Sequence, residues 1–218
     1  MTLADLIDDF REESHDLGTP PFWSFERLAK IASEGQREAC RRGDLLIDST
    51  GPMCFASVTA GDPVVTLDPR SLDVKRVRLA SRGFQLFPVT TGRMDEYAST
   101  WEQDSGEPTN YVTDYQTGAI LLYPIPVSDD DLLLTVRRLP LADLVDDADE
   151  PEIRLEAQPA LVQWMLYRAY SKQDADTFDP QKAARALAEF EREFGRKTSA
   201  RNEQWMRSDH VVGADPIA

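Results

Sequence analysis

The spacing of apolar residues changes twice along this 218-residue chain, and these changes constrain the fold more than any single motif. Near both ends, apolar residues recur every three or four positions, as in helices with one buried face; in the middle they alternate every second residue, as in half-buried strands. Helical and strand segments that are segregated along a sequence are typical of the α+β class. We therefore expect a helical bundle built from both chain ends with an inserted β-rich domain.

The expected domain boundaries follow these changes of pattern. Residues 1–49 and 157–200 are assigned to a helical body, residues 50–156 to a β-rich insertion with one short helix, and residues 201–218 to a C-terminal tail. Within the body, helices are expected over residues 3–17, 24–46, 157–171 and 181–194. The tail has too little apolar face for a stable helix of its own, so we expect it to order only against a partner.

In the β-rich region, the apolar phase slips by one residue around Arg76, which predicts a β-bulge. The run TTGRMDEYASTWEQD predicts a short helix with Met94, Tyr97 and Trp101 on one face. Residues 119–126 and 131–140 read as two strands of a hairpin that turns at 127–130. The prolines at the end of the first strand place that end at a sheet edge or outside the sheet.

Composition excludes several function classes. With 24 basic and 39 acidic residues the formal charge is −15, which disfavours binding to a nucleic-acid backbone. The acidic excess is greatest from Asp129 to Glu156, where we expect solvated loop. Cys40 and Cys54 have no metal-site spacing and are expected to be reduced thiols. Neither a signal peptide nor an apolar run of membrane-spanning length is recognised, so no membrane partner is expected.

No motif for catalysis or for a cofactor is present. The sequence lacks a phosphate-binding loop, a dinucleotide fingerprint, a nucleophile elbow and a zinc-protease motif. Its two histidines, His15 and His210, are expected at a helix end and in the solvated tail. We therefore expect no enzyme, no catalytic or metal residue and no cofactor, and a binding or structural role is favoured.

Three aspartates, Asp174, Asp176 and Asp179, cluster between the last two expected helices. They do not match a calcium-binding loop, because that alignment places Phe178, Asp179 and Arg185 at its key positions. Asp179 followed by Pro180 instead fits the start of a helix. A subunit contact and a metal or catalytic site are the alternatives.

A basic cluster of Lys75, Arg76, Arg78 and Arg82 alternates with apolar residues. This pattern is typical of the solvated face of a strand. An ion-paired contact with an acidic neighbour and a contact with DNA are the alternatives.

The helix expected at 157–171 is apolar on two sides. Helices of this kind usually pack on both sides, so it is predicted to be central. One stripe contains Leu161, Trp164 and Met165, and the second contains Val162, Leu166, Ala169 and Tyr170.

The order of segments resembles the head-to-tail adaptor (connector or neck) proteins of short-tailed bacteriophages. The resemblance spans about residues 3–200 and is carried by the acidic first helix, FWSFERLAKIASEGQREACRR, TGAILLYPIP with the following LLLTVRRLPL, and YRAYSKQDADTFDPQKAARALAEFEREFG. It implies a structural virion protein of the neck or tail, made in the host cytoplasm. Such a protein forms a ring, typically of twelve copies, that joins the portal to the tail nozzle or tube, and DNA passes through without specific binding.

The resemblance also implies two sets of contact residues. The C-terminal segment would dock on the portal protein through Trp205, Met206, Val211, Val212 and Ile217. Packing between subunits would use the second stripe of the central helix: Val162, Leu166, Ala169 and Tyr170. The alternatives to the adaptor function are another tail or collar component, a cellular interaction module, or a metal-dependent hydrolase with a carboxylate site.

Overall fold

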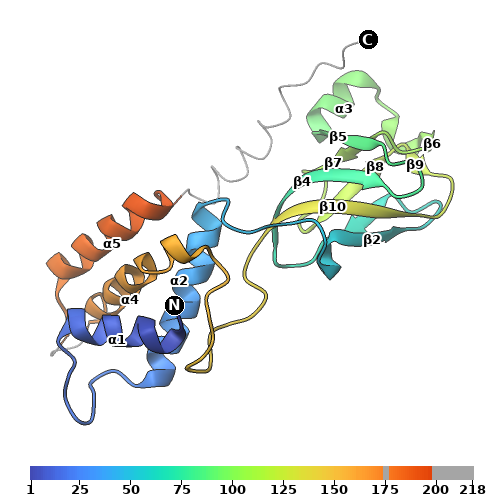
Figure 1. Cartoon of the computed structure of the whole chain (residues 1–218). Helices are drawn as coiled ribbons and strands as arrows, with labels where there is room; N and C mark the ends of the chain where they lie inside the picture. The colour runs from blue at the N-terminus through green and yellow to red at the C-terminus, as the bar shows by residue number, and fades with distance from the viewer. Residues whose placement is uncertain (174–176, 198–218) are drawn as a thin grey trace. The chain divides into compact units, whose positions relative to one another are not determined.

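The computed structural model describes residues 1–173 and 177–197, which fold as two compact units. The helical unit comprises residues 1–46 and 139–197, and the β unit comprises residues 47–138 (Figure 1). The chain thus enters the β unit from the helical unit and later returns to it. The mixed α+β class expected from the sequence is confirmed.

The helical unit is built from helices that come from both sides of the β unit in the sequence. These are α1 (Leu3–Ser14), α2 (Phe25–Arg42), α4 (Ala160–Tyr170) and α5 (Pro180–Phe194), with the 3-10 turn η3 (Leu155–Ala157) before α4. The start predicted for α5 is confirmed, because the Asp179 carboxylate accepts hydrogen bonds from the amides of Gln181 and Lys182, both at 3.0 Å. Asp174 and Asp176 lie outside the described residues.

Helix α4 is central in this unit, as its two apolar stripes predict. It packs against α1, α2 and α5, and the four helices share one hydrophobic core. The largest contributors to this core are Leu3, Leu6, Phe10, Leu28, Ile31, Leu161, Met165, Phe190 and Phe194.

The acidic segment 139–156 belongs to the helical unit, although the sequence pattern assigns it to the β-rich insertion. Most of its carboxylates are exposed, as expected, but Leu144 and Ile153 are buried in the helical core. Its backbone carbonyls at Asp149 and Asp147 accept hydrogen bonds from the first amides of α1, at 2.7 and 3.1 Å. The segment therefore satisfies the free N–H groups at a helix start and is not a free loop.

The β unit contains a sheet that curls back on itself. Its path runs β1-β10-β4-β5-β7-β8-β3, with β2 also paired to β10, and β2 and β3 contact each other. The strands of this sheet are β1 (Ile47–Asp48), β2 (Phe55–Val58), β3 (Val64–Thr66), β4 (Ser71–Leu79), β5 (Gln85–Val89), β7 (Asn110–Val112), β8 (Ala119–Tyr123) and β10 (Asp130–Arg138). The inner face encloses one core, formed by Cys54, Val58, Val65, Val77, Leu79, Leu86, Tyr111, Ile120, Leu122, Leu132, Leu134 and Val136.

The bulge predicted in β4 is confirmed by the pairing register. Thr135 of β10 pairs with Arg76, but the next residue, Val136, pairs with Val74. Lys75 is therefore the extra residue on β4. It lets Val74 and Val77 lie on the core side despite their uneven spacing.

The predicted hairpin across residues 127–130 is wrong. β8 pairs with β3 and β7, whereas β10 pairs with β1, β2 and β4. The alternation in each segment fixes which side chains point inward but does not identify the neighbouring strand. The prolines behave as expected, because β8 ends at Tyr123 and β9 (Ile125–Pro126) pairs with β6 (Ser105–Gly106) in a separate two-stranded sheet.

The predicted short helix is α3 (Thr91–Tyr97), which is followed by the turn η2 (Trp101–Gln103). Met94 and Trp101 are buried and form a second small core with Val112 and Leu121. Tyr97, predicted on the same face, is exposed because the helix ends there and the chain turns away.

Asp48 and Arg138 form an ion pair where the chain enters and leaves the β unit. Asp48 accepts hydrogen bonds from the amides of Thr50 and Gly51, at 3.0 and 2.9 Å, and Arg138 Nε lies 3.1 Å from its other oxygen. The hydrogen bonds from these two amides lower the pKa of Asp48, and Arg138 lowers it further, whereas burial raises it. The net result is a pKa of about 2.

Replacing Asp48 by asparagine is expected to lower the free energy of unfolding of the β unit by about 2 kcal/mol at neutral pH. A depressed folded-state pKa gives stability that is present above the unfolded value near 3.8 and is lost as the pH falls toward about 2. The wild-type β unit should therefore lose this contribution across that range, and the Asp48→Asn variant should not. Hydrogen exchange of peptides from residues 47–138 measures this change in the free energy of unfolding.

Asp62→Asn is the matched control. Asp62 also accepts a backbone hydrogen bond, from Val64 at 3.0 Å, but it lies in an exposed turn. Asparagine can make the same turn, so its effect should stay below about 0.5 kcal/mol. Equal losses of unfolding free energy in Asp48→Asn and Asp62→Asn would contradict the stabilising role assigned to Asp48.

Candidate interaction site

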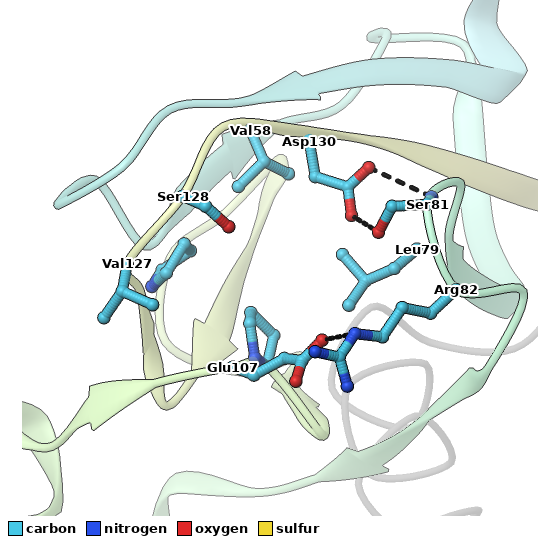
Figure 2. A pocket seen from close by; sticks show the side chains of 10 residues that line it. Val58, Leu79, Ser81, Arg82, Glu107, Val127, Ser128 and Asp130 are labelled. Atoms are coloured by element: carbon cyan, nitrogen blue, oxygen red, sulfur yellow. Dashed lines mark hydrogen bonds and ion pairs between the residues drawn. The ribbon is translucent and has the colours of Figure 1, made fainter.

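A pocket of about 250 Å³ opens among the loops at one end of the β unit (Figure 2). It is lined by Val58, Leu79, Ser81, Arg82, Glu107, Pro108, Pro126, Val127, Ser128 and Asp130. These residues come from separate strand ends and turns, which the curled sheet brings together. The pocket is large enough for one or two side chains of a partner protein.

Four of the polar side chains that line the pocket pair with each other. Ser81 donates from Oγ to Asp130 at 2.5 Å and from its amide at 3.2 Å, and Arg82 forms an ion pair with Glu107 (Figure 2). The neighbouring Asp129 carboxylate accepts the Ala60 amide at 2.8 Å. Aspartates thus fix the loops that form the rim.

The Ser81–Asp130 pair is not an activated nucleophile. Burial by itself raises the pKa of Asp130, but the hydrogen bonds from the Ser81 side chain and from the Asp131 and Ser81 amides outweigh it and leave the pKa below its usual value. A carboxylate of low pKa is a poor general base, and the lining residues include no histidine. The hydrogen bonds from Ser81 to Asp130 therefore hold the turn at Ser81 in place.

A second, open hollow lies at the start of α2. It is lined by Phe22, Trp23, Ser24, Arg27 and Lys172. The Asp16 carboxylate accepts hydrogen bonds from the amides of Phe22 and Trp23, at 2.7 and 3.0 Å, and so fixes the backbone that borders this hollow. The Lys172 ammonium lies 5.7 Å from the centre of the Trp23 ring, in a cation–π contact.

Within residues 1–173 and 177–197, no group of three or more histidine, cysteine or carboxylate side chains is placed to hold a metal ion. Cys40 and Cys54 are both buried and are not joined in a disulfide, as expected for reduced thiols. In the same part of the chain, no helix combines the length and apolarity that a bilayer crossing requires.

The predicted basic cluster separates into two kinds of residue. Lys75 pairs with Asp73 at 3.2 Å, and Arg82 pairs with Glu107 in the pocket. Arg76 and Arg78 lie on the outer face of β4, because Val77 between them points into the core. Both the ion-paired and the solvated-face interpretations therefore apply, to different members of the cluster.

The predicted subunit-packing residues lie inside the chain's own helical core. Val162, Leu166 and Ala169 are buried there, and Tyr170 is partly buried against it. Their stripe is covered by neighbouring helices of the same chain, so it offers little free surface to another subunit.

The predicted portal-docking residues lie outside the described part of the chain. The sequence interpretation missed the pocket, because its residues come from four short segments. From the sequence, Arg82, Pro126 and the turn at 127–130 were singled out, each for another reason.

A family model described as SU10 adaptor protein matches residues 1–212, so the chain belongs to that family. This membership confirms the resemblance to phage head-to-tail adaptors and supports a structural role as a virion component. A search of curated proteins gives no match.

Proposed function

We propose that this protein forms a ring of twelve copies in the virion neck, where it joins the portal protein to the tail nozzle or tube. The observation that carries this proposal is the match to an adaptor family over residues 1–212, which includes both compact units. The protein is made in the host cytoplasm and is incorporated into the virion there.

The two units have different tasks in this proposal. The helical unit, a bundle built from both chain ends, forms the body of the ring. The β unit presents its loops and pocket to the tail partner. The chain carries a formal charge of −15, so DNA passes through the ring without being retained, because like charges suppress binding to phosphates.

Portal docking is assigned to the C-terminal tail and to Trp205, Met206, Val211, Val212 and Ile217. The structure fixes where a truncation must begin. Arg42 donates a hydrogen bond to the Gly195 carbonyl at 3.1 Å, so a deletion that includes Gly195 would also damage the helical unit. Deleting residues 198–218 removes the tail and keeps this bond.

The test mixes purified portal rings with the full-length chain or with the 198–218 deletion and images the products by electron microscopy. The full chain should add a ring to the portal, and the deletion should not, while its melting temperature stays unchanged. Trp205→Ala in the full chain should also weaken docking. Undiminished binding by the deletion variant would refute the docking assignment. A full chain that binds a tail or collar protein but not the portal would favour another position in the tail.

A further inference from the structure

The outer face of the β unit carries an unusual row of side chains across four strands. Leu133 of β10 points away from the core, with Phe55 of β2 opposite it on one side and Arg78 of β4 on the other. Gln85 of β5 continues the row opposite Arg78. Arg76 lies two residues from Arg78 along β4, on the same face.

Large apolar groups on this face are exposed to solvent. Phe55 and Phe87 are each 54% exposed, and Ile47 is 58% exposed. Phe87 follows Gln85 by two residues, so it lies on the same side of β5. Aromatic residues and arginine together are enriched in protein–protein interfaces, and clustered exposed apolar groups mark interaction sites.

The same face carries two positive charges, those of Arg76 and Arg78. Within residues 1–173 and 177–197, neither Arg76 nor Arg78 has a carboxylate in ion-pair distance. In a chain with 39 acidic residues this is notable, because a carboxylate partner would be easy to provide. A partner surface that carries carboxylates would pair with them.

Helix α1 provides a surface of that kind. Asp8, Asp9 and Glu12 are exposed on the side opposite its buried residues and, in the described part of the chain, make no ion pair. Partial burial, then repulsion from Glu12 and other nearby carboxylates, raises the pKa of Asp9. Like charges at helical spacing destabilise a helix, and a cationic partner would relieve this repulsion.

The spacings on the two surfaces agree. Arg76 and Arg78 are two residues apart on a strand, which is about 6.6 Å at ~3.3 Å per residue. Asp8 and Glu12 are four residues apart on a helix, which is about 6 Å at 1.5 Å per residue. A helix laid along β4 could therefore place one carboxylate near each arginine.

We propose that the outer face of β2, β10, β4 and β5 in one copy of this protein binds the acidic face of α1 in a neighbouring copy. The inference rests on the proposed ring, and it names the surface that holds the ring together. Copies that each carry a charge of −15 repel one another at long range, so their contact requires local charge complementarity of this kind. Phe55, Leu133 and Phe87 would supply the apolar part of the interface.

Disulfide trapping between full-length copies tests the contact. An Arg78→Cys variant is mixed with a Glu12→Cys variant under mild oxidation, and crosslinked dimers are counted on a non-reducing gel. Trapping accumulates even from weak association, and the native Cys40 and Cys54 are buried and should not compete. The matched control is Arg93→Cys with Glu12→Cys, because Arg93 is an exposed arginine on α3 and does not belong to the four strands of this face.

We expect the first pair to give at least tenfold more mixed dimer than the control pair. Adding Arg76→Glu to the Arg78→Cys variant should reduce the yield several-fold, and adding Asp8→Arg to the Glu12→Cys variant should restore it. A yield equal to that of the control, or a yield insensitive to both charge changes, would overturn the inference.

Crosslinking and ring formation on the portal, taken together, separate this inference from the proposed function. If crosslinking fails but the wild-type chain still forms a ring on the portal, the ring stands and this interface is wrong. Crosslinking without a ring on the portal would support the contact and contradict the proposed function. If Arg76→Glu with Arg78→Glu abolishes binding to a labelled single-stranded DNA and no dimer is trapped, the face binds nucleic acid and the inference fails.

Discussion

Replacing Arg42 by alanine is expected to lower the free energy of unfolding of the helical unit by about 3–5 kcal/mol. The Arg42 side chain is only 4% exposed, and it lies 3.0 Å from Glu38 and 3.5 Å from Glu191. Its guanidinium also stacks over the rings of Trp164 and Phe190, at 5.6 and 5.1 Å. Its loss would leave the buried Glu38 carboxylate with only the longer ion pairs to Arg41 and Lys197, at 3.4 and 4.0 Å, and would open a void between α2, α4 and α5. Urea unfolding followed by hydrogen exchange of helical-unit peptides measures the effect.

Arg41→Ala is the matched control, because Arg41 is the preceding residue and also pairs with Glu38, at 3.4 Å. Arg41 is 38% exposed, so its replacement should cost less than about 1 kcal/mol. A double variant, Arg42→Met with Glu38→Leu, removes both charges and should regain most of the loss. If the double variant were no more stable than Arg42→Ala, the buried charge would not be the cause.

Replacing Gly35 by valine is expected to destabilise the helical unit by about 3 kcal/mol. A Cβ at Gly35 would lie 2.9 Å from Cδ1 of Trp164 and 3.2 Å from its Cβ and Cγ. Trp164 itself is held by Phe190 and by Arg42, so it cannot move aside without disturbing the core. The gain in helix propensity over glycine, about 0.5 kcal/mol or less, does not offset the clash.

Gly92→Val in α3 provides the comparison, because a Cβ there meets no atom within 4 Å. Its effect on the β unit should stay within about 0.5 kcal/mol. The free energy of unfolding of the Gly35→Ala variant should lie between those of the wild type and the Gly35→Val variant. A Gly35→Val variant as stable as wild type would show that α2 and α4 are not in the close contact described.

These two predictions depend on contacts that the sequence pattern indicates only in part. The small residues Gly35 and Ala39 along one side of α2 indicate that a neighbour approaches closely, and Trp164 is that neighbour. Helical spacing also identifies α4 as the central helix. It does not show that Arg42 is buried, because an arginine near a helix C-terminus is usually explained by the helix dipole and solvent.

Local patterns in the β unit were informative where neighbouring residues alone determine the outcome. The bulge at Lys75 follows from the slip in apolar phase, and the end of β8 follows from its prolines. Strand partners depend on the whole sheet. β8 therefore pairs with strands on either side of it in the curled path, and not with the strand that follows it in the chain.

The acidic segment and the pocket were beyond the reach of pattern analysis for a similar reason. Leu144 and Ile153 are buried, but neighbouring apolar residues such as Val145 and Leu155 are exposed, so spacing alone does not show which apolar residues of this highly charged stretch join the core. The pocket combines strand ends and turns, such as Ser81 and Asp130, that are far apart in the sequence. Such sites are determined by topology, which local spacing does not specify.

Electron cryomicroscopy of the virion neck tests the central claim most directly, namely that this protein is a structural ring between head and tail. We predict a ring of density next to the portal into which the helical unit and the β unit can be fitted, one pair for each copy. A neck in which that position is filled by density of another fold, or virions that lack this chain, would contradict the account.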